Sequence, residues 1–513
     1  MVWGGVKLQR KLSELLNKSW AVTGLAPGQD LEVASLAYDS RQVRPGGLFV
    51  AVRGFRQDGR KFIPDALARG AKAVVVDDPG VTLPPGIVRV LVPDSRSALP
   101  DLAAAFFDYP SRKLQLVGIT GTNGKTTTAF MSEAIFRNAG YTTGLIGTVE
   151  NHVGSEVLPV ERTTPESVDV EELLYRMHQA QVAYAVMEVS SHALELGRVK
   201  NLEFDVAVFT NLTQDHLDFH ETFDNYRTAK AKLFRQLSAS GVRGGERTAI
   251  INADDPSGET MRQATRAQVL TYGIKKPADI VAEDIDIGAK AATFTVRCAQ
   301  GSERIRLRLT GLFSVYNALA ACGVGLALGV DLSCVKAALE NLPGVPGRFE
   351  QVYAGQDFAV IVDYAHTPDG LENILRTAKE FARGRILLVF GCGGDRDRTK
   401  RPIMGCLAAE YADLVFITSD NPRSEEPLAI IKEIEAGARQ DPGARAVLEI
   451  IPDRRAAIGA AIKAARPEDV VLIAGKGHET YQIIGDRVLP FDDRAVALEF
   501  LKEMNFHAAG DGR

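Results

Sequence analysis

The sequence predicts an α/β protein of three domains, with a doubly wound parallel sheet in the middle of the chain. Three observations support this expectation. The chain has 513 residues, which is too long for a single hydrophobic core. Two long stretches alternate apolar strand candidates with helical segments, as parallel sheets do. Turn-forming segments at 109–112 and 343–347 separate these stretches.

The first domain, predicted at residues 1–110, is a smaller α/β unit. It contains strand candidates at 48–52 and 73–76 and a helix around 64–69. Its turn-like segments 39–41 and 56–60 carry hydroxyl, amide and guanidinium groups that suit a phosphorylated ligand. Judged from the residues alone, ordinary surface turns are the favoured interpretation of both segments.

A glycine-rich loop at 118–127 opens the second domain, which is predicted to cover residues 111–345. The loop follows the strand candidate 114–117 and leads into a helix that ends near Gly140. Ile119 stands where the strict P-loop spacing requires glycine, so the simple pattern fails at one position. The order of strand, loop and helix nevertheless favours a P-loop-type fold over a plain glycine turn.

The residue types in this loop suit the phosphates of ATP. Gly121 and Gly124 have no Cβ between the backbone N–H groups and an anion. The side chain of Lys125 is long enough to reach terminal phosphates, and the Thr126 hydroxyl suits Mg²⁺. The loop therefore predicts a nucleotide-phosphate site.

Polar clusters follow three later strand candidates of the second domain. Residues 188–192 end the strand at 183–189, and residues 210–216 follow the strand at 204–209. Residues 252–255 come after a third short strand. The carboxyl ends of parallel strands meet at one edge of a sheet, so these clusters predict one shared site with the phosphate loop.

Two side chains in these clusters are candidate ligands of Mg²⁺. Glu188 offers a carboxylate and His216 an imidazole, and the carboxylate is chemically the better magnesium ligand. For each residue taken alone, a structural cap or a satisfied polar group is an equally good interpretation.

The third domain, predicted at residues 346–513, is a Rossmann-like α/β unit. Polar residues follow each of its four strand candidates, which are 360–362, 386–390, 414–417 and 470–473. The glycines at 391–394 resemble the start of a dinucleotide fingerprint. The third glycine is missing and Asp395 would repel pyrophosphate, so NAD binding is disfavoured.

The composition excludes several classes of partner. The net charge of −5 argues against a nucleic acid as the main ligand. The five cysteines are scattered without a CxxC pair, which fits a reducing compartment and excludes a cysteine zinc cluster. The apolar run 318–330 is too short to span a bilayer, and no signal-peptide pattern is present. We therefore expect a cytoplasmic protein that does not insert into membranes and acts as a monomer on small molecules.

Together these motifs resemble the Mur ligase family, whose ATP-dependent enzymes build the peptide stem of bacterial peptidoglycan. The resemblance spans essentially the whole chain and rests on residues 121–127, 188–192, 211–218, 316–318, 347–350 and 363–368. Asp420-Asn421-Pro422-Arg423 narrows it to members that join meso-2,6-diaminopimelate to UDP-N-acetylmuramoyl-L-alanyl-D-glutamate. The implied reaction forms an acyl phosphate on the D-glutamate γ-carboxylate, which the amine then attacks.

The resemblance also implies a UDP-substrate domain, an ATPase domain and an amino-acid domain, in that order, and gives roles to individual residues. ATP would contact Gly121, Thr122, Asn123, Gly124, Lys125, Thr126, Thr127, Asn317, Arg348 and Asp363. The UDP substrate would contact Tyr38, Ser40, Thr163, Thr164, Ser190 and Arg198. Diaminopimelate would contact Arg396, Asp420, Asn421, Pro422, Arg423, Gly475 and Glu479. Mg²⁺ would be held by Thr126, Glu188, His216 and Lys230, the last as a carbamate, with Lys125, Lys230 and His216 in catalysis.

The residues themselves say less about three of these positions. Judged from spacing alone, Lys230 is a solvated helix residue, so its carbamate rests on the resemblance only. Leu196 stands where some relatives have glutamine, and Phe55 replaces a histidine that some relatives use near the uridine. Both departures weaken the expectation for the UDP-substrate contacts.

Four other functions remain as alternatives. A lysine-adding Mur ligase and a folylpolyglutamate-type ligase share the nucleotide loop, and the N-terminal domain and residues 420–423 argue against the second. A P-loop ATPase switch would hydrolyse ATP without an amino-acid acceptor. A non-catalytic binding protein is disfavoured because Lys125, Glu188 and His216 are all present.

Overall fold

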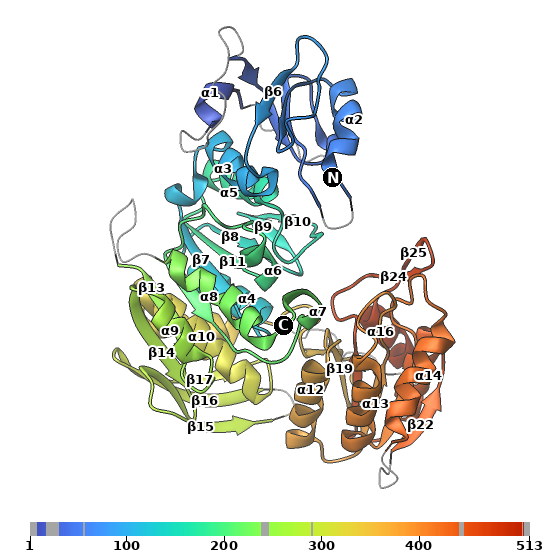
Figure 1. The fold of residues 1–513 in the computed structure, drawn as a ribbon. Helices are drawn as coiled ribbons and strands as arrows, with labels where there is room; N and C mark the ends of the chain where they lie inside the picture. Colours follow the sequence, from blue (N-terminus) through green and yellow to red (C-terminus); the bar gives the residue numbers. More distant parts are fainter. Residues whose placement is uncertain are drawn as a thin grey trace.

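The structure is a computed structural model that describes residues 8–16, 30–54, 57–237, 246–288, 291–440, 446–504 and 506. Its strands form three large sheets that follow one another along the chain, of four, eleven and six strands. Figure 1 shows the N-terminal part in blue at the top, the central part in green and yellow below it, and the C-terminal part in orange and red beside the central part. The α/β fold class is confirmed.

The N-terminal sheet is parallel, with the strand order β3-β4-β5-β6. Its strands are β3 Ser35–Ala37, β4 Gly47–Val50, β5 Ala71–Val76 and β6 Val88–Leu91, and its helices are α2 Ile63–Ala68 and α3 Ser95–Phe106. A small antiparallel pair, β1 Arg10–Lys11 and β2 Glu32–Val33, lies beside α1 Leu12–Leu15. The two central strands are the most buried, because the sheet packs on both faces around the apolar residues of β4 and the valine run of β5.

The central sheet has the order β10-β9-β8-β11-β7-β12-β13-β14-β15-β16-β17. The middle of the sheet, which consists of β8, β11, β7, β12, β13, β14 and β15 in this order, is parallel, as expected. At the two edges, β9, β10, β16 and β17 pair in antiparallel fashion. The strands are β7 Gln115–Thr120, β8 Thr143–Ile146, β9 Asn151–Val153, β10 Glu156–Leu158, β11 Tyr184–Glu188, β12 Val206–Phe209, β13 Thr248–Asn252, β14 Gln268–Gly273, β15 Ile280–Ile287, β16 Ala292–Cys298 and β17 Gly301–Leu307. The sheet is therefore mixed rather than purely parallel.

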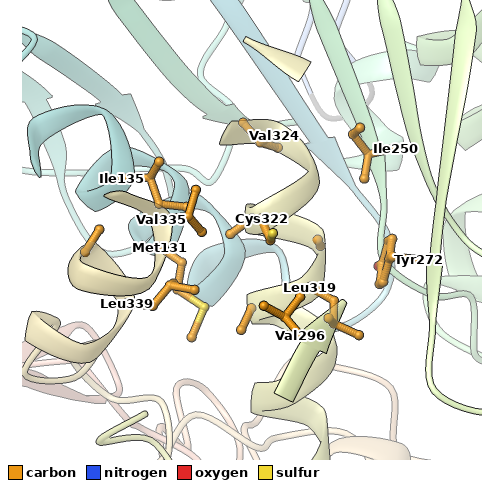
Figure 2. Close-up of a cluster of buried hydrophobic side chains, with 14 of the residues drawn as sticks. Met131, Ile135, Ile250, Tyr272, Val296, Leu319, Cys322, Val324, Val335 and Leu339 are labelled. Carbon is orange, nitrogen blue, oxygen red and sulfur yellow. The ribbon is translucent and has the colours of Figure 1, made fainter. Parts of the chain in front are cut away.

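Helices pack on both faces of this sheet and bury two apolar layers. They are α4 Lys125–Asn138, α5 Ser167–Gln179, α6 Ser191–Glu195, α7 Leu217–His220, α8 Phe223–Gln236, α9 Gly258–Ala264, α10 Leu312–Ala327 and α11 Leu332–Asn341. Figure 2 shows one layer, in which Leu319 and Cys322 of α10 lie between Met131 of α4 and Tyr272 of β14. This packing holds α4, and with it the phosphate loop at its start, rigidly against the sheet.

The C-terminal sheet has the order β18-β19-β23-β20-β21-β22, and its strands are parallel except for β18. The strands are β18 Glu350–Gln351, β19 Ala359–Asp363, β20 Ile386–Phe390, β21 Leu414–Ile417, β22 Val447–Ile450 and β23 Val470–Ala474. The helices are α12 Pro368–Phe381, α13 Lys400–Tyr411, α14 Pro427–Ala438, α15 Arg454–Ala464 and α16 Asp493–Glu503. A separate hairpin, β24 Tyr481–Ile484 and β25 Arg487–Pro490, follows the last parallel strand.

Both segments between the sheets are ordered turns. Tyr109 has φ 49° and precedes a short 3₁₀ helix, η3 Pro110–Lys113, whose Pro110 and Ser111 are buried. Gly347 has φ +66°, and a Cβ there would lie 2.1 Å from the backbone nitrogen of His478. Only glycine fits this position, because a side chain would push the second connection away from the loop after β23.

The described residues contain no helix that is long and apolar enough to cross a membrane.

Candidate active site

The phosphate loop lies between the end of β7 and the start of α4, and its glycines allow close contacts. Gly121 and Gly124 have φ +152° and +83°, and a Cβ on them would lie 1.8 Å from Thr210 Oγ1 and 2.3 Å from Asn317 Oδ1 respectively. The backbone N–H of Asn123 donates to Asn211 Oδ1 at 2.9 Å. The loop is thus held by the residues that follow β12, with its backbone at the N-terminus of α4 as an anion site requires.

Two lysine side chains meet at one carbonyl of this loop. Lys125 Nζ donates to the carbonyl oxygens of Gly121 and Thr122 at 3.0 and 2.7 Å, and Lys230 Nζ donates to the same Gly121 oxygen at 2.7 Å. Burial lowers the pKa of both lysines, and their mutual repulsion adds to the effect on Lys230. Two ammonium groups at one oxygen are unfavourable, so this arrangement favours a neutral amine on Lys230.

The interpretation of Lys230 as a solvated helix residue is wrong. Its side chain is only 1% exposed, and its Nζ lies 4.5 Å from the ring centroid of Tyr226. Both residues lie on the buried face of α8, together with Ala229, Leu233 and Phe234. The apolar stripe of that helix therefore carries Lys230 into the site, and this stripe is a signal that the sequence contained.

Glu188, at the end of β11, is buried and accepts hydrogen bonds from both sides. Thr126 Oγ1 donates to its Oε2 at 3.0 Å, while the backbone N–H and the hydroxyl of Thr148 donate to Oε1 and Oε2 at 2.8 and 3.0 Å. The carboxylate thus lies at the start of α4, beside the loop. Thr148 was not singled out in the sequence, because a lone threonine between two strands carries no pattern.

His216 lies at the turn before α7, with φ 54°, and 44% of its side chain is exposed. Its ring is 4.8 Å from that of His192 and 6.1 Å from that of Tyr226, both measured between centroids. The surrounding protein disfavours the charged imidazolium, and His192, Lys125 and Lys230 add to this effect, so the pKa of His216 is lowered despite Asp215. A neutral imidazole is the form that binds metals.

The donors at this site fit Mg²⁺ in kind. Glu188 offers two carboxylate oxygens and Thr126 a hydroxyl, and Mg²⁺ needs only one or two protein carboxylates when phosphates and water complete its shell. Among the described residues, no group of three or more His, Cys, Asp and Glu side chains is arranged to hold a metal without such help.

Residues of the C-terminal part reach the phosphate loop. Arg348 NH2 donates to Thr126 Oγ1 at 3.0 Å, and its guanidinium lies 4.8 Å from the Tyr364 ring centroid. Asp363 accepts from the backbone N–H groups of Phe349 and Ala365 at 2.6 and 2.7 Å, and burial raises the pKa of its carboxyl. The structure thus places Arg348 directly beside the loop, while Asp363 fixes the backbone next to Arg348.

Asp369 makes a second contact of this kind, which sequence reasoning missed. Its carboxylate, at the start of α12, accepts from Asn123 Nδ2 of the phosphate loop and from Thr213 Oγ1, the latter at 3.0 Å. The sequence segment 363–368 ends one residue earlier, and nothing in the local pattern pointed across to the loop.

The residues expected at the UDP substrate fall in two neighbouring groups. Thr164 links one group, since its hydroxyl donates to the Glu188 carbonyl at 2.8 Å and accepts from the Ser190 N–H at 3.0 Å. Arg198 NH1 donates to the Thr164 carbonyl at 3.0 Å, and the hydroxyls of Thr148 and Thr163 are hydrogen-bonded at 3.1 Å, with Thr148 as the acceptor because its proton goes to Glu188. This group therefore lies directly beside Glu188.

The other group lies where the N-terminal sheet meets α5. Tyr38 OH donates to Asp169 Oδ2 at 2.7 Å, and Ser40 is buried in a short 3₁₀ helix, η1 Ser40–Gln42. A cavity of about 450 Å³ opens here, lined by both parts of the chain, including Tyr38, Arg41, Asn151, Arg162, Asp169 and Arg176. Leu196 ends α6 as its C-cap residue, and Phe55 lies outside the described residues.

The residues expected at diaminopimelate meet at the carboxyl ends of β20, β21 and β23. Arg423 has φ 53°, and its NH1 donates to the Gly394 carbonyl at 2.8 Å. Asn421 Nδ2 donates to Glu479 Oε2 at 2.8 Å, and a Cβ on Gly475 would lie 2.5 Å from Asp420 Oδ2. Arg396 is exposed on the neighbouring loop, with its NH1 donating to the Asp395 carbonyl at 3.0 Å. Pro422 completes the turn before Arg423.

Comparison with known proteins matches three consecutive family models to the chain. They are described as Mur ligase family, catalytic domain (residues 32–107), Mur ligase middle domain (119–325) and Mur ligase, glutamate ligase domain (347–477). Together they follow the three sheets of the structure.

Curated relatives match over nearly the full length. A UDP-N-acetylmuramoyl-L-alanyl-D-glutamate--2,6-diaminopimelate ligase of Geobacillus thermodenitrificans is 48% identical over 498 residues, which are 97% of this chain and 100% of the relative. The relative of the same name from Bacillus velezensis is 47% identical and covers 96% of this chain and 99% of its own.

Solved structures show the same architecture. A structure titled UDP-N-acetylmuramoyl-L-alanyl-D-glutamate--2,6-diaminopimelate ligase aligns with a TM-score of 0.64 and 33% identity, covering 92% of this chain and 95% of that one. MurF from Acinetobacter baumannii aligns with a TM-score of 0.67 at 22% identity, over 91% and 96% of the two chains, and shows the fold alone. The full-length identity to curated relatives and the three consecutive family models show that this chain belongs to the Mur ligase family.

Proposed function

We propose that this protein is an ATP- and Mg²⁺-dependent ligase that joins meso-2,6-diaminopimelate to the D-glutamate γ-carboxylate of UDP-N-acetylmuramoyl-L-alanyl-D-glutamate in the cytoplasm. The observation that carries the proposal is the contact between Arg348 and Thr126, which joins the C-terminal part to a phosphate loop that already holds Lys125. A ligase needs such a contact, because the amino acid must meet a carboxylate activated at the phosphates.

In this proposal each part of the chain has one task. Residues 1–110 bind the UDP end, residues 111–345 bind ATP, and residues 346–513 bring the amino acid. The cavity beside Tyr38 suits the nucleotide end of the UDP substrate, and Thr164, Ser190 and Arg198 lead from that side of the chain towards Glu188. The peptide end of the substrate would therefore lie near the phosphate loop. That the protein acts as a monomer stays a prediction.

The reaction solves a simple chemical problem, since a carboxylate oxygen is too poor a leaving group for an amine to displace. An oxygen of the D-glutamate γ-carboxylate attacks the γ-phosphorus of ATP, and the bond to the β-phosphate oxygen breaks to release ADP. The amine of diaminopimelate then attacks the acyl carbon, loses a proton and expels phosphate. Lys125 and Arg348 stabilise the charge that develops during phosphoryl transfer.

Glu188, Thr126 and His216 would hold Mg²⁺, which neutralises phosphate charge when bound. Lys230 fits the carbamate that the family resemblance implies, because burial and Lys125 favour its neutral amine. The amine lone pair would attack the carbon of CO₂ and the nitrogen would lose a proton, which gives a carboxylate at the end of a long side chain. The carbamate would place an anion beside the Lys125 ammonium at Gly121, where the neutral amine of Lys230 offers no charge.

Arg423 is the proposed reader of the second carboxylate, by which diaminopimelate differs from lysine. A guanidinium donates two parallel hydrogen bonds to a carboxylate, which an ammonium group does not. Glu479 carries the opposite charge and suits the ammonium group of the same end. A lysine-adding ligase would need neither a cation aimed at that end nor its turn at 420–423.

The test is to incubate the purified protein with ATP, Mg²⁺ and the UDP-dipeptide, and to add diaminopimelate, lysine or neither. We expect a UDP-tripeptide by mass spectrometry with diaminopimelate, little with lysine, and none for Lys125→Ala, whose thermal unfolding should match wild type. Phosphate release that needs no amino acid would indicate an ATPase switch. Product formed with lysine in preference to diaminopimelate would indicate the lysine-adding ligase.

A further inference from the structure

One buried ion pair lies beneath the residues expected to bind the amino acid. Lys476, directly after Gly475, is completely buried, and its Nζ donates to Glu479 Oε2 at 3.0 Å and to Asn421 Oδ1 at 3.2 Å. Asn421 Nδ2 donates to the same Glu479 oxygen at 2.8 Å. The three side chains form a closed triangle that joins the loop after β21 to the loop after β23.

This triangle fixes one half of the Glu479 carboxylate. Oε2 accepts from two donors, so the carboxylate has no freedom to rotate about its last bond. Within the part of the chain that the structure describes, Oε1 of Glu479 accepts no hydrogen bond, and the Glu479 side chain is 14% exposed whereas that of Lys476 is 0% exposed. One oxygen is therefore anchored below, and the other is available at the surface of the site.

A second ion pair at the same sheet edge shows what a purely structural pair looks like. Arg454 and Asp493 pair at 2.6 Å with both side chains 0% exposed, and Arg454 also donates to the Ala474 carbonyl at the end of β23. Neither side chain of that pair reaches the surface. In the pair of Lys476 and Glu479, by contrast, the Glu479 carboxylate is partly exposed while the lysine is not.

The triangle also holds the segment that carries Arg423. Asn421 Oδ1 accepts from the backbone N–H of Ile483 at 2.9 Å, and the Arg423 N–H donates to the Ile483 carbonyl at 3.1 Å. Strand β24 is thereby joined to the 420–423 turn at two points. Lys476 therefore supports Glu479 directly, and it supports Arg423 through Asn421, which lies in the same turn.

From this geometry we propose that Lys476 is a positioning residue, which orients Glu479 towards the distal ammonium group of diaminopimelate and so sets the preference for a zwitterionic end. The inference rests on the proposed function, because it assumes that diaminopimelate binds beside Glu479. Lys476 does not touch the substrate in this account. It acts by holding the carboxylate that does.

The test compares diaminopimelate with 2-aminopimelate, an analogue that keeps both carboxylates and the reacting amine but lacks the distal ammonium group. We expect Lys476→Met to lower the ratio of kcat/KM for diaminopimelate to that for 2-aminopimelate by at least about 10-fold, mainly through the KM of diaminopimelate. The KM values for ATP and the UDP-dipeptide should stay within about 2-fold of wild type. Lys463→Met, at an exposed position on α15 of the same domain, is the matched control and should leave the ratio unchanged.

Two further variants decide how the effect arises. Glu479→Gln should lower the same ratio, and adding Lys476→Met to it should lower the ratio no further, since the lysine acts only through the carboxylate. The double variant leaves no unpaired buried charge. Its comparison with Glu479→Gln therefore tests the inference even if Lys476→Met alone does not fold. Equal losses for both amino acids in Lys476→Met, or full additivity in the double variant, would overturn the inference. Failure of the wild-type protein to use diaminopimelate at all would refute the proposed function instead.

Discussion

Lys230 is a buried lysine beside the phosphate loop, and its burial bears directly on its charge. Burial, and then the positive charge of Lys125, lower the pKa of Lys230, whose Nζ donates to the same Gly121 carbonyl as Lys125 Nζ. A carbamate on this amine would add a negative charge beside Lys125. The role proposed for Lys230 therefore depends on charge balance beside the phosphate loop.

Lys230→Ala should lower the ligation rate by at least about 100-fold, the usual effect of removing one charged group that stabilises the transition state. Added acetate or formate should restore part of the activity, because a small carboxylate fits the space left by the side chain. The rate is measured across a range of acetate concentrations, with Lys232→Ala, on the exposed side of α8, as the control. An alanine variant that is fully active without acetate would rule out the carbamate.

Glu171 is a second buried ionisable group, and its protonation affects how the stability of the protein depends on pH. It lies on the inner face of α5, 2% exposed, and its Oε2 has no hydrogen-bond partner in the described part of the chain. Burial raises the pKa of its carboxyl from 4.5 to about 8, despite the opposing charge of Arg112. Folded protein therefore keeps the proton in a pH range in which the unfolded chain has lost it.

The free energy of unfolding should accordingly fall as pH rises from about 4.5 to about 8, with the full contribution of Glu171 present only below that window. The amide of Glu171→Gln does not ionise, so this variant avoids the loss of stability. Near pH 8.5 it should be more stable than wild type by on the order of 2 kcal/mol, and the difference should shrink near pH 5. Denaturant unfolding at both pH values measures this. A difference that is the same at both, or that matches the exposed Glu156→Gln control, would mean that Glu171 is ionised in the folded protein.

At the scale of elements, the sequence predicted the buried parallel strands well because they are continuous apolar runs. The strands Ile386–Phe390 and Leu414–Ile417 have the expected bounds. Strand β7 was expected at 114–117 and is found at Gln115–Thr120. The antiparallel strands β16 and β17 were missed. In β16 buried and half-buried residues alternate, but this period-two pattern does not show which distant strand is the partner. Contacts between domains, such as Asp369 with Asn123, leave no periodic signal at all.

The turn after β21 determines which amino acid is used, if Arg423 reads the second carboxylate. Charge-assisted hydrogen bonds contribute about 1.5–3 kcal/mol, so Arg423→Ala should lower kcat/KM for diaminopimelate by about 10- to 100-fold. Lysine has no second carboxylate, so its kcat/KM should fall much less. Both amino acids are assayed with wild type and variant, and equal losses would show that Arg423 does not read that carboxylate.

The start of α12 links the C-terminal part of the chain to the phosphate loop through Asp369. Asp369→Ala should loosen this contact and admit water to the acyl phosphate, so that phosphate release exceeds amide formation by at least about 2-fold. The two products are measured in one reaction mixture. Glu380→Ala, exposed on the same helix, serves as the control, and a ratio that stays at one in both variants would remove Asp369 from any role in closure.

Over the whole molecule, the three sheets bring together residues that lie far apart in the sequence. Residues of the central part hold the phosphate loop, Arg348 and Asp369 contact it from the C-terminal part, and the cavity beside Tyr38 is lined by residues of the N-terminal and central parts. The sequence predicted the three parts and the phosphate loop, because each is local. It could not predict which side chains cross between the parts, since that depends on how the folded parts are placed.

In the proposed reaction, an acyl phosphate joins phosphoryl transfer to amide formation. The most direct measurement uses UDP-dipeptide labelled with ¹⁸O in the D-glutamate γ-carboxylate, together with ATP and diaminopimelate in ordinary water. We expect one ¹⁸O atom in each phosphate released, because a carboxylate oxygen attacks the γ-phosphorus and leaves with it when the amide forms. Phosphate that contains no ¹⁸O while ATP is consumed would mean that water attacks the γ-phosphorus, and would contradict the account.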